Sequence, residues 1–333
     1  MAIAATPLRF AQHVVERSPL SVALFFGFVG YVLCAALTAS LPGGVFLGSR
    51  IYDLYFLSLM DGRLDLPPRL VAAEGHFTPD GRAYIYHGLA PLLTRAIAWP
   101  FVDLRTISMA LPTIVLFIFI GSAFFLRALV DQIPKADVPA ARYQWLVIIL
   151  TLMVFVLSPG IMFVVNHAIF SEPISVQWAM LGIVFWAFSR VVFRGAPAIW
   201  AVPIVGLCAA LSVHARPHTA LVLYAATLSL MALALLAPRG SLGRGVAWRD
   251  LTFRNGAWRH DLKIWLPVLL TLIAMVGSGC LLLALNDLRS GSPFITHGSL
   301  GPGTALQYGH GFLGIEAPDD PRVQAWEEHG PIH

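Results

Sequence analysis

The segment LSVALFFGFVGYVLCAALTASL, residues 20–41, contains no charged side chain and decides the class of protein to which the chain belongs. A helix of about 20 apolar residues crosses the ~30 Å hydrocarbon core of a bilayer. The segment is longer than the apolar core of a typical signal peptide, and it lacks a clear Ala-x-Ala cleavage site. We therefore expect an uncleaved first membrane span, preceded by Arg9 and Arg17.

Comparable apolar segments recur along the 333 residues, of which 57% are hydrophobic and 12% charged. A shorter apolar segment, 92–102, is interrupted by Arg95 and Pro100, and it predicts a re-entrant or interfacial helix. Pro159 and Gly160 predict a kink in the third span. The sequence thus predicts an all-α polytopic membrane protein with about seven transmembrane helices, at 20–41, 104–126, 145–165, 174–193, 198–213, 219–236 and 264–285.

The distribution of Lys and Arg predicts the orientation of these helices. Basic residues with few acids occupy 1–19 and 237–263, whereas 42–91 balances arginines against aspartates and glutamates. Cytoplasmic loops carry the excess of Lys and Arg, so we expect a cytoplasmic N-terminus and an extracytoplasmic first loop. The same reasoning divides the chain into a transmembrane module, 1–285, and an extracytoplasmic C-terminal tail, 286–333. The net charge of +4 reports this orientation and gives no reason to expect nucleic-acid binding.

The first outer loop concentrates both signs of charge in a chain that is poor in charge. Its main part, residues 50–91, reads RIYDLYFLSLMDGRLDLPPRLVAAEGHFTPDGRAYIYHGLAP. An amphipathic helix is predicted at 51–60, and two Asp-Gly turns and a Pro-Pro break follow it. This order predicts a structured surface. The alternative is a solvated connector between spans.

Asp53 lies on the predicted helix 51–60, whose Tyr55 and Leu57 can pack on the membrane surface. An acid held there is partly shielded from water, which suits a general base. In the alternative interpretation, Asp53 forms an ion pair with Arg50, three residues before it.

Glu172 follows the third predicted span within NHAIFSEP, residues 166–173. A carboxylate at a span boundary is costly unless it has a partner, which makes Glu172 a candidate site residue. Alternatively, Ser171 caps a helix and Glu172 interacts with the helix dipole. His167 in the same segment could bind a carboxylate or a phosphate, although a lone histidine at an interface is more often structural.

Arg216 lies between His214 and His218 in the link that joins two apolar spans. A guanidinium in this position suits an anionic ligand, and phosphate best of all. The alternative is that Arg216 extends toward the lipid headgroups while its stem stays in apolar surroundings. Arg289, which follows the last span, allows the same two interpretations.

Four motifs in order along the chain resemble the GT-C superfamily, the polytopic glycosyltransferases that use polyprenyl-phosphate-linked sugars. Asp53 and the following DGRLDLP are similar to the first outer loop of that family. DGRAYIYHGLAPLL, residues 80–93, resembles the Asp-Gly-x-x-Tyr…Gly-x-x-Pro stretch of many bacterial members. FSEP at 170–173 and NDLRSGSPF at 286–294 complete the match.

The resemblance implies a glycosyltransferase of the bacterial inner membrane whose donor is a polyprenyl-phosphate-linked sugar. It makes Asp53 the base that activates the acceptor hydroxyl, with Glu172 as a second catalytic candidate. It places Arg216 and Arg289 near the lipid phosphate, with Tyr84, Tyr86, His167 and His214 as further substrate-binding candidates. The sequence shows no metal-ligand spacing, and it neither requires nor excludes a divalent metal cofactor.

Two departures from the family pattern keep other classes open. Many members carry paired acids after the first span, whereas Asp53 has no acidic neighbour, and seven spans are fewer than most members have. A non-catalytic membrane partner or scaffold subunit with a degenerate GT-C-like fold is therefore the main alternative. A transporter would place charged or broken-helix residues at the middle of the membrane, and the predicted spans carry few of them.

Overall fold

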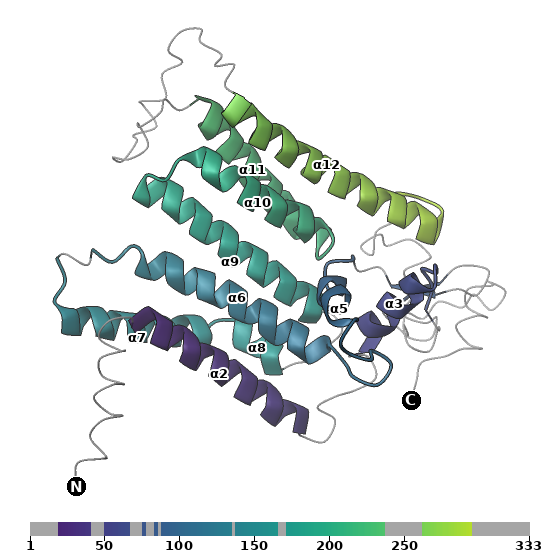
Figure 1. Cartoon of the computed structure of the whole chain (residues 1–333), viewed down its shortest axis with the longest axis horizontal. Coiled ribbons are helices and arrows are strands. Elements are labelled where there is room, and N and C mark those ends of the chain that lie inside the picture. The colour runs from purple at the N-terminus through teal and green to yellow at the C-terminus, as the bar shows by residue number, and fades with distance from the viewer. Residues whose placement is uncertain are drawn as a thin grey trace, which may run out of the picture.

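The computed structural model of the chain describes residues 19–40, 50–66, 75–77, 83–85, 88–134, 137–165, 171–236 and 262–294. These residues are mostly helical, and the long helices lie side by side in one bundle (Figure 1). Five of the described helices are long and apolar enough to cross a membrane, which agrees with the predicted polytopic membrane protein. They are α2 (Pro19–Ser40), α6 (Ala110–Val130), α9 (Ser171–Arg194), α11 (Pro217–Leu236) and α12 (Leu262–Ser290).

The predicted count of seven spans is not confirmed, because two of the seven regions form shorter helices. α10 (Ala198–Val213) agrees with its predicted bounds but has only 16 residues. The third region is divided into α7 (Ala140–Phe155) and α8 (Gly160–Val165). The break falls directly before Gly160, at the predicted kink, where Pro159 cannot donate a backbone hydrogen bond.

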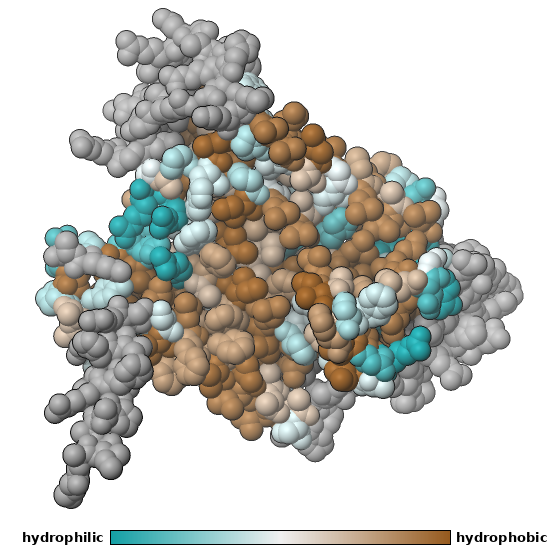
Figure 2. All heavy atoms as spheres, in the orientation of Figure 1, coloured by the Kyte–Doolittle hydropathy of each residue, from teal (hydrophilic) through white to brown (hydrophobic). Residues whose placement is uncertain are grey.

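Close packing of α6 against α9 forms the centre of the bundle. A Cβ atom added at Gly121 would lie 2.6 Å from the carbonyl oxygen of Trp178. One added at Gly182 would lie 2.4 Å from the carbonyl oxygen of Gly121. The two backbones touch because glycine has no side chain to hold them apart, as is common between helices in membranes. In Figure 2, hydrophobic side chains cover the middle of the bundle, and hydrophilic ones gather toward its ends.

Two short helices, α3 (Ile51–Met60) and α5 (Leu92–Ala98), pack together at the end of the bundle where α6 and α9 begin (Figure 1). α3 has the bounds that its amphipathic pattern predicted. A two-stranded antiparallel hairpin belongs to the same loop, with β1 (Gly75–Phe77) paired to β2 (Ala83–Ile85). An apolar cluster joins these elements, formed by Ile51, Tyr52, Tyr55, Phe56, Leu66, Ile85, Leu92 and Leu104.

One expectation about this end of the bundle needs correction, and a second is not confirmed. Tyr55 is fully buried in the apolar cluster and does not lie on the membrane surface. The apolar segment 92–102 forms only the seven-residue helix α5, so a re-entrant helix is not confirmed. Tyr55 is buried because neighbouring elements of the apolar cluster cover it, which hydropathy along the sequence does not reveal.

Candidate functional site

Arg95 of α5 joins the two acidic residues that the sequence singled out. Its Nε donates a 2.8 Å hydrogen bond to Oδ1 of Asp53 on α3. Its Nη2 donates a 3.1 Å hydrogen bond to Oε1 of Glu172 in the first turn of α9, and its Nη1 bonds Oε2 of the same carboxylate. Asp53 and Arg95 are 0% exposed and Glu172 is 2% exposed. We call these three residues the Arg95 cluster.

Neighbouring groups complete the hydrogen bonding of the Arg95 cluster. Nη1 of Arg95 also donates to the hydroxyl of Thr113 on α6, at 2.8 Å, and to the carbonyl oxygen of Pro91, at 3.1 Å. The backbone N–H of Met109 lies 3.2 Å from Oδ1 of Asp53. The cluster therefore ties α3, α5, α6 and α9 to one another. Such buried ionic groups persist only when their hydrogen bonds are satisfied.

Two carboxylates face one guanidinium in surroundings that water does not reach. Burial by itself would lower the pKa of Arg95, but the charges of Glu172 and Asp53 outweigh it, so the pKa is raised. Arg95 therefore stays protonated, and the two carboxyl groups share its one guanidinium. Buried titratable groups held against a fixed cation are candidates for proton transfer or for orienting a polar substrate.

The alternative interpretation of Asp53 is wrong, because Arg50 does not pair with it. Arg50 donates instead to the backbone carbonyl oxygens of Leu104, at 3.2 Å, and Arg105. The partner that Glu172 needs is Arg95, which sequence reasoning treated only as an interruption of an apolar segment. A lone arginine inside an apolar segment needs a partner of opposite charge, and this was the signal that could have found Arg95.

A second contact brings Arg289, near the end of α12, to the first-loop helix. Its guanidinium carbon lies 5.5 Å from the centre of the Tyr55 ring, and Nη2 donates a hydrogen bond to the Tyr55 hydroxyl. Burial raises the pKa of Tyr55, and the positive charge of Arg289 offsets only part of that rise. Asp53 and Tyr55 are two residues apart on α3, so the same helix contacts Arg95 and Arg289.

The link between α10 and α11 is held against the loop that precedes α5. The backbone N–H of Ala90 donates a 3.0 Å hydrogen bond to the carbonyl oxygen of His214. A Cβ atom added at Gly88 would lie 2.1 Å from that oxygen, so only glycine allows this approach. The His214 side chain is buried, and burial together with the charge of Arg289 lowers its pKa. The structure thus brings His214 to the same end of the bundle as Arg289.

The remaining predicted site residues are less closely associated with these groups. Arg216 is half-buried, and no hydrogen bond or ion pair joins its side chain to the Arg95 cluster within the described residues. Tyr84 lies buried on β2, opposite His76. Tyr86 and His167 lie outside the described residues. In the part of the chain that the structure describes, no group of three or more His, Cys, Asp or Glu side chains could hold a metal ion.

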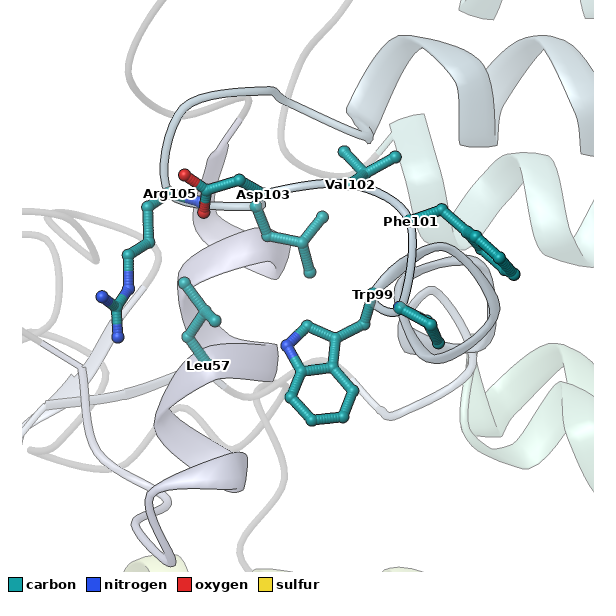
Figure 3. A pocket seen from close by; sticks show the side chains of 8 residues that line it. Leu57, Trp99, Phe101, Val102, Asp103 and Arg105 are labelled. Atoms are coloured by element: carbon teal, nitrogen blue, oxygen red, sulfur yellow. The ribbon is translucent and has the colours of Figure 1, made fainter.

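A shallow hollow of about 500 Å³ lies beside α3, on the connection from α5 to α6 (Figure 3). Its lining comprises Leu57 and the continuous segment from Trp99 to Arg105. It does not include any member of the Arg95 cluster. The hollow and the Arg95 cluster are therefore separate features of the same end of the bundle.

Comparison of the chain with protein-family models, with curated proteins and with solved structures gives no match.

Proposed function

We propose that the protein is an integral membrane glycosyltransferase that moves a sugar from a polyprenyl-phosphate donor to a lipid, glycan or protein acceptor at the extracytoplasmic face. One observation carries the proposal. Asp53 of the first loop and Glu172 of α9 are far apart in the sequence, yet they share one buried guanidinium at the end of the bundle that also holds Arg289. These are the residues that the resemblance to GT-C enzymes marks as catalytic and phosphate-binding.

In this proposal Asp53 is the general base. The acceptor oxygen forms a bond to the anomeric carbon while its proton passes to a carboxylate oxygen of Asp53. The bond from that carbon to the phosphate oxygen breaks, and the lipid phosphate leaves with the bonding electrons. Arg95 and Met109 hold the carboxylate in one orientation through hydrogen bonds. Because Asp53 is fully buried, the reaction requires the elements that cover it to open when substrates bind.

Arg289 is the group that would bind the donor phosphate. A guanidinium presents several N–H donors in one plane, which suits phosphate oxygens, and the Tyr55 hydroxyl beside it adds another polar group. Arg216 lies on the link next to this region and would extend the positive surface toward the membrane, and the His214 imidazole on the same link would offer a hydrogen-bonding group. No metal ion is required for the residues to play these roles, and a divalent cation on the phosphate is compatible with them.

The proposal includes seven membrane crossings, with the N-terminus in the cytoplasm of a bacterial inner membrane and α5 at the outer interface. Helices occur in all seven predicted regions, and α3 and α5 lie together at one end of them. Arg127, Arg142 and Arg190 occupy the opposite end, as the positive-inside rule requires.

Thiol reagents added from outside should label cysteines introduced at Gly75 and Gly303 but not at Gly245. Labelling at Gly245 alone would overturn the orientation.

A specific observation favours a second candidate, a non-catalytic membrane partner. Asp53 is fully buried, and its carboxylate already accepts hydrogen bonds from Arg95 and from the backbone of Met109. A purely structural ion cluster would have these properties. The test is to supply the purified protein, in vesicles, with labelled polyprenyl-phosphate hexoses and pentoses and a membrane lipid extract as acceptor. The enzyme releases sugar from at least one donor, whereas a scaffold subunit releases none.

A further inference from the structure

The connection between α5 and α6 exposes an unusual amount of apolar surface at the end of the bundle. Phe101 is 86% exposed, and Ile97 and Trp99 are exposed beside it. Arg105 lies only five residues before Ala110, where the candidate span α6 begins. This segment therefore lies at the level where a span meets the lipid headgroups, the depth at which tryptophan is enriched. We call Ile97, Trp99 and Phe101 the α5–α6 shelf.

The hollow described above opens on the α5–α6 shelf and combines an apolar floor with one charge of each sign. Leu57, Val102 and Leu104 supply apolar lining, and the edge of the Trp99 ring packs near Phe56, 6.3 Å between centroids. Asp103 and Arg105 belong to the same lining, and both are exposed. Figure 3 shows Asp103 and Arg105 on the same stretch of the α5–α6 connection, with Leu57 and Trp99 beside it and the Arg105 guanidinium extending away from the Asp103 carboxylate.

The backbone that carries these two charges is fixed by hydrogen bonds. Asp103 accepts from the backbone N–H of Arg105, at 3.0 Å, and from the hydroxyl of Thr106, at 3.3 Å. Arg50 donates to the carbonyl oxygen of Arg105. Within the described residues, the Arg105 guanidinium itself has no hydrogen-bond or ion-pair partner. A carboxylate and an unpaired guanidinium are thus held two residues apart at the mouth of an apolar hollow.

We infer that this hollow binds a phospholipid whose headgroup carries a primary ammonium group. The Arg105 guanidinium donates to the phosphate, the ammonium group donates to the Asp103 carboxylate, and the acyl chains run along Trp99 and Phe101. An ammonium group has three hydrogen-bond donors, whereas a quaternary ammonium has none and a glycerol headgroup has no positive charge. The site therefore selects phosphatidylethanolamine over phosphatidylcholine and phosphatidylglycerol. The inference does not depend on glycosyl transfer.

Lipid retention by the full-length protein tests this inference. The delipidated protein in detergent is mixed with equal amounts of the three phospholipids, which share identical acyl chains, and bound lipid is counted by native mass spectrometry. The parent should retain phosphatidylethanolamine about tenfold better than phosphatidylcholine, the effect of one charge-assisted hydrogen bond. Asp103→Asn should abolish this preference, and Arg105→Gln should weaken retention of both lipids about tenfold.

Matched controls come from the opposite end of the bundle, where Asp137 and Arg142 are also exposed. Asp137→Asn and Arg142→Gln should retain lipid as the parent does. All four substitutions change exposed side chains, so folding should be preserved, as circular dichroism would verify. Equal retention of the three lipids by the parent would overturn the inference, as would equal behaviour of Asp103→Asn and Asp137→Asn. Displacement of the lipid by free phosphoethanolamine at comparable concentration would overturn the assignment to a membrane lipid.

Discussion

The two ends of the bundle hold mirror-image arrangements of charge. At one end Arg95 lies between two carboxylates, and the whole cluster is at most 2% exposed. At the other end Asp131 lies between two arginines, 3.2 Å from Arg127 and 3.6 Å from Arg190, whose side chains are 49% and 39% exposed. Water screens the second arrangement, so such ion pairs contribute roughly 0–1 kcal/mol. The first is shielded from water, and its charged groups depend on one another and on the hydrogen bonds with Thr113, Pro91 and Met109.

This comparison teaches that the number of ion pairs says little about their importance. Asp131 can lose a partner and be solvated instead, because it lies near the surface. Asp53 and Glu172 cannot, because removal of Arg95 would leave two carboxyl groups without a cation in a buried site. Substitutions at the two ends should therefore differ in size even though the chemical changes are the same.

The largest effect is expected for Arg95→Met. The free energy of unfolding should fall by roughly 3–5 kcal/mol, the cost of breaking a buried ion pair and leaving its partners uncompensated. The change would be measured by thermal unfolding in detergent, with size-exclusion chromatography to quantify the protein that stays folded at each temperature. Arg127→Met is the matched control and should be nearly neutral. Equal losses of stability in the two variants would contradict the distinction between the two ends.

If Arg95→Met does not accumulate as folded protein, a triple variant keeps the comparison testable. Arg95→Met combined with Asp53→Asn and Glu172→Gln removes all three charges together. It should recover part of the lost stability, since no buried charge remains without a partner. A triple variant as unstable as the single one would show that packing of the arginine side chain, and not charge, holds this end together.

A smaller effect is expected for Gly88→Ala, which tests the docking of the first loop on the α10–α11 link. The added methyl group would meet the His214 carbonyl oxygen, which belongs to the backbone and cannot rotate away. The loop must shift, at a cost of about 1–3 kcal/mol as for other overpacked sites. Gly277→Ala is the control, because nothing lies within 4 Å of its added Cβ atom. The unfolding temperatures of the two variants, measured in parallel, test this expectation: Gly88→Ala should unfold at a lower temperature than Gly277→Ala.

The smallest effect is expected for Asp131→Asn. Its stability should change by less than about 1 kcal/mol, and the difference from the parent should shrink further at high salt, which screens exposed charges. Unfolding temperatures in about 50 mM and about 500 mM salt, between which the Debye length falls from roughly 14 Å to roughly 4 Å, give the measurement. A large loss that salt does not change would mean that the second arrangement is as dependent on its charges as the first.

Much of the fold could be predicted from the sequence because apolar length and amphipathic pattern are local properties. The bounds of α3 follow from its pattern and from Asp61-Gly62 after it, where Gly62 adopts the left-handed conformation that glycine favours. α10 likewise agrees with its predicted bounds. The division of the third span into α7 and α8 was predicted only as a kink, since the length of each piece depends on packing against α2 and α6.

The candidate site could be predicted only in part. Asp53, Glu172 and Arg289 stood out because a charge beside an apolar segment is costly, and all three prove to be buried with polar partners. Their partners could not be assigned, because Arg95 and Tyr55 reach them through contacts between distant parts of the chain. Arg50 was the nearest cation in sequence to Asp53, but its side chain instead donates hydrogen bonds to backbone carbonyl oxygens of the α5–α6 connection.

The most direct test of the account is the rate of sugar transfer by Asp53→Asn. Asparagine keeps the shape of the side chain and can still accept the hydrogen bond from Arg95, so the protein should fold and bind the donor. Without the carboxylate, transfer from the polyprenyl-phosphate sugar that the parent uses should fall by on the order of 10²–10⁴, the contribution of a positioned general base. Asp61→Asn, an exposed position at the end of the same helix, should transfer sugar at the parental rate. Equal rates for Asp53→Asn and the parent, or no transfer by the parent from any such donor, would contradict the account.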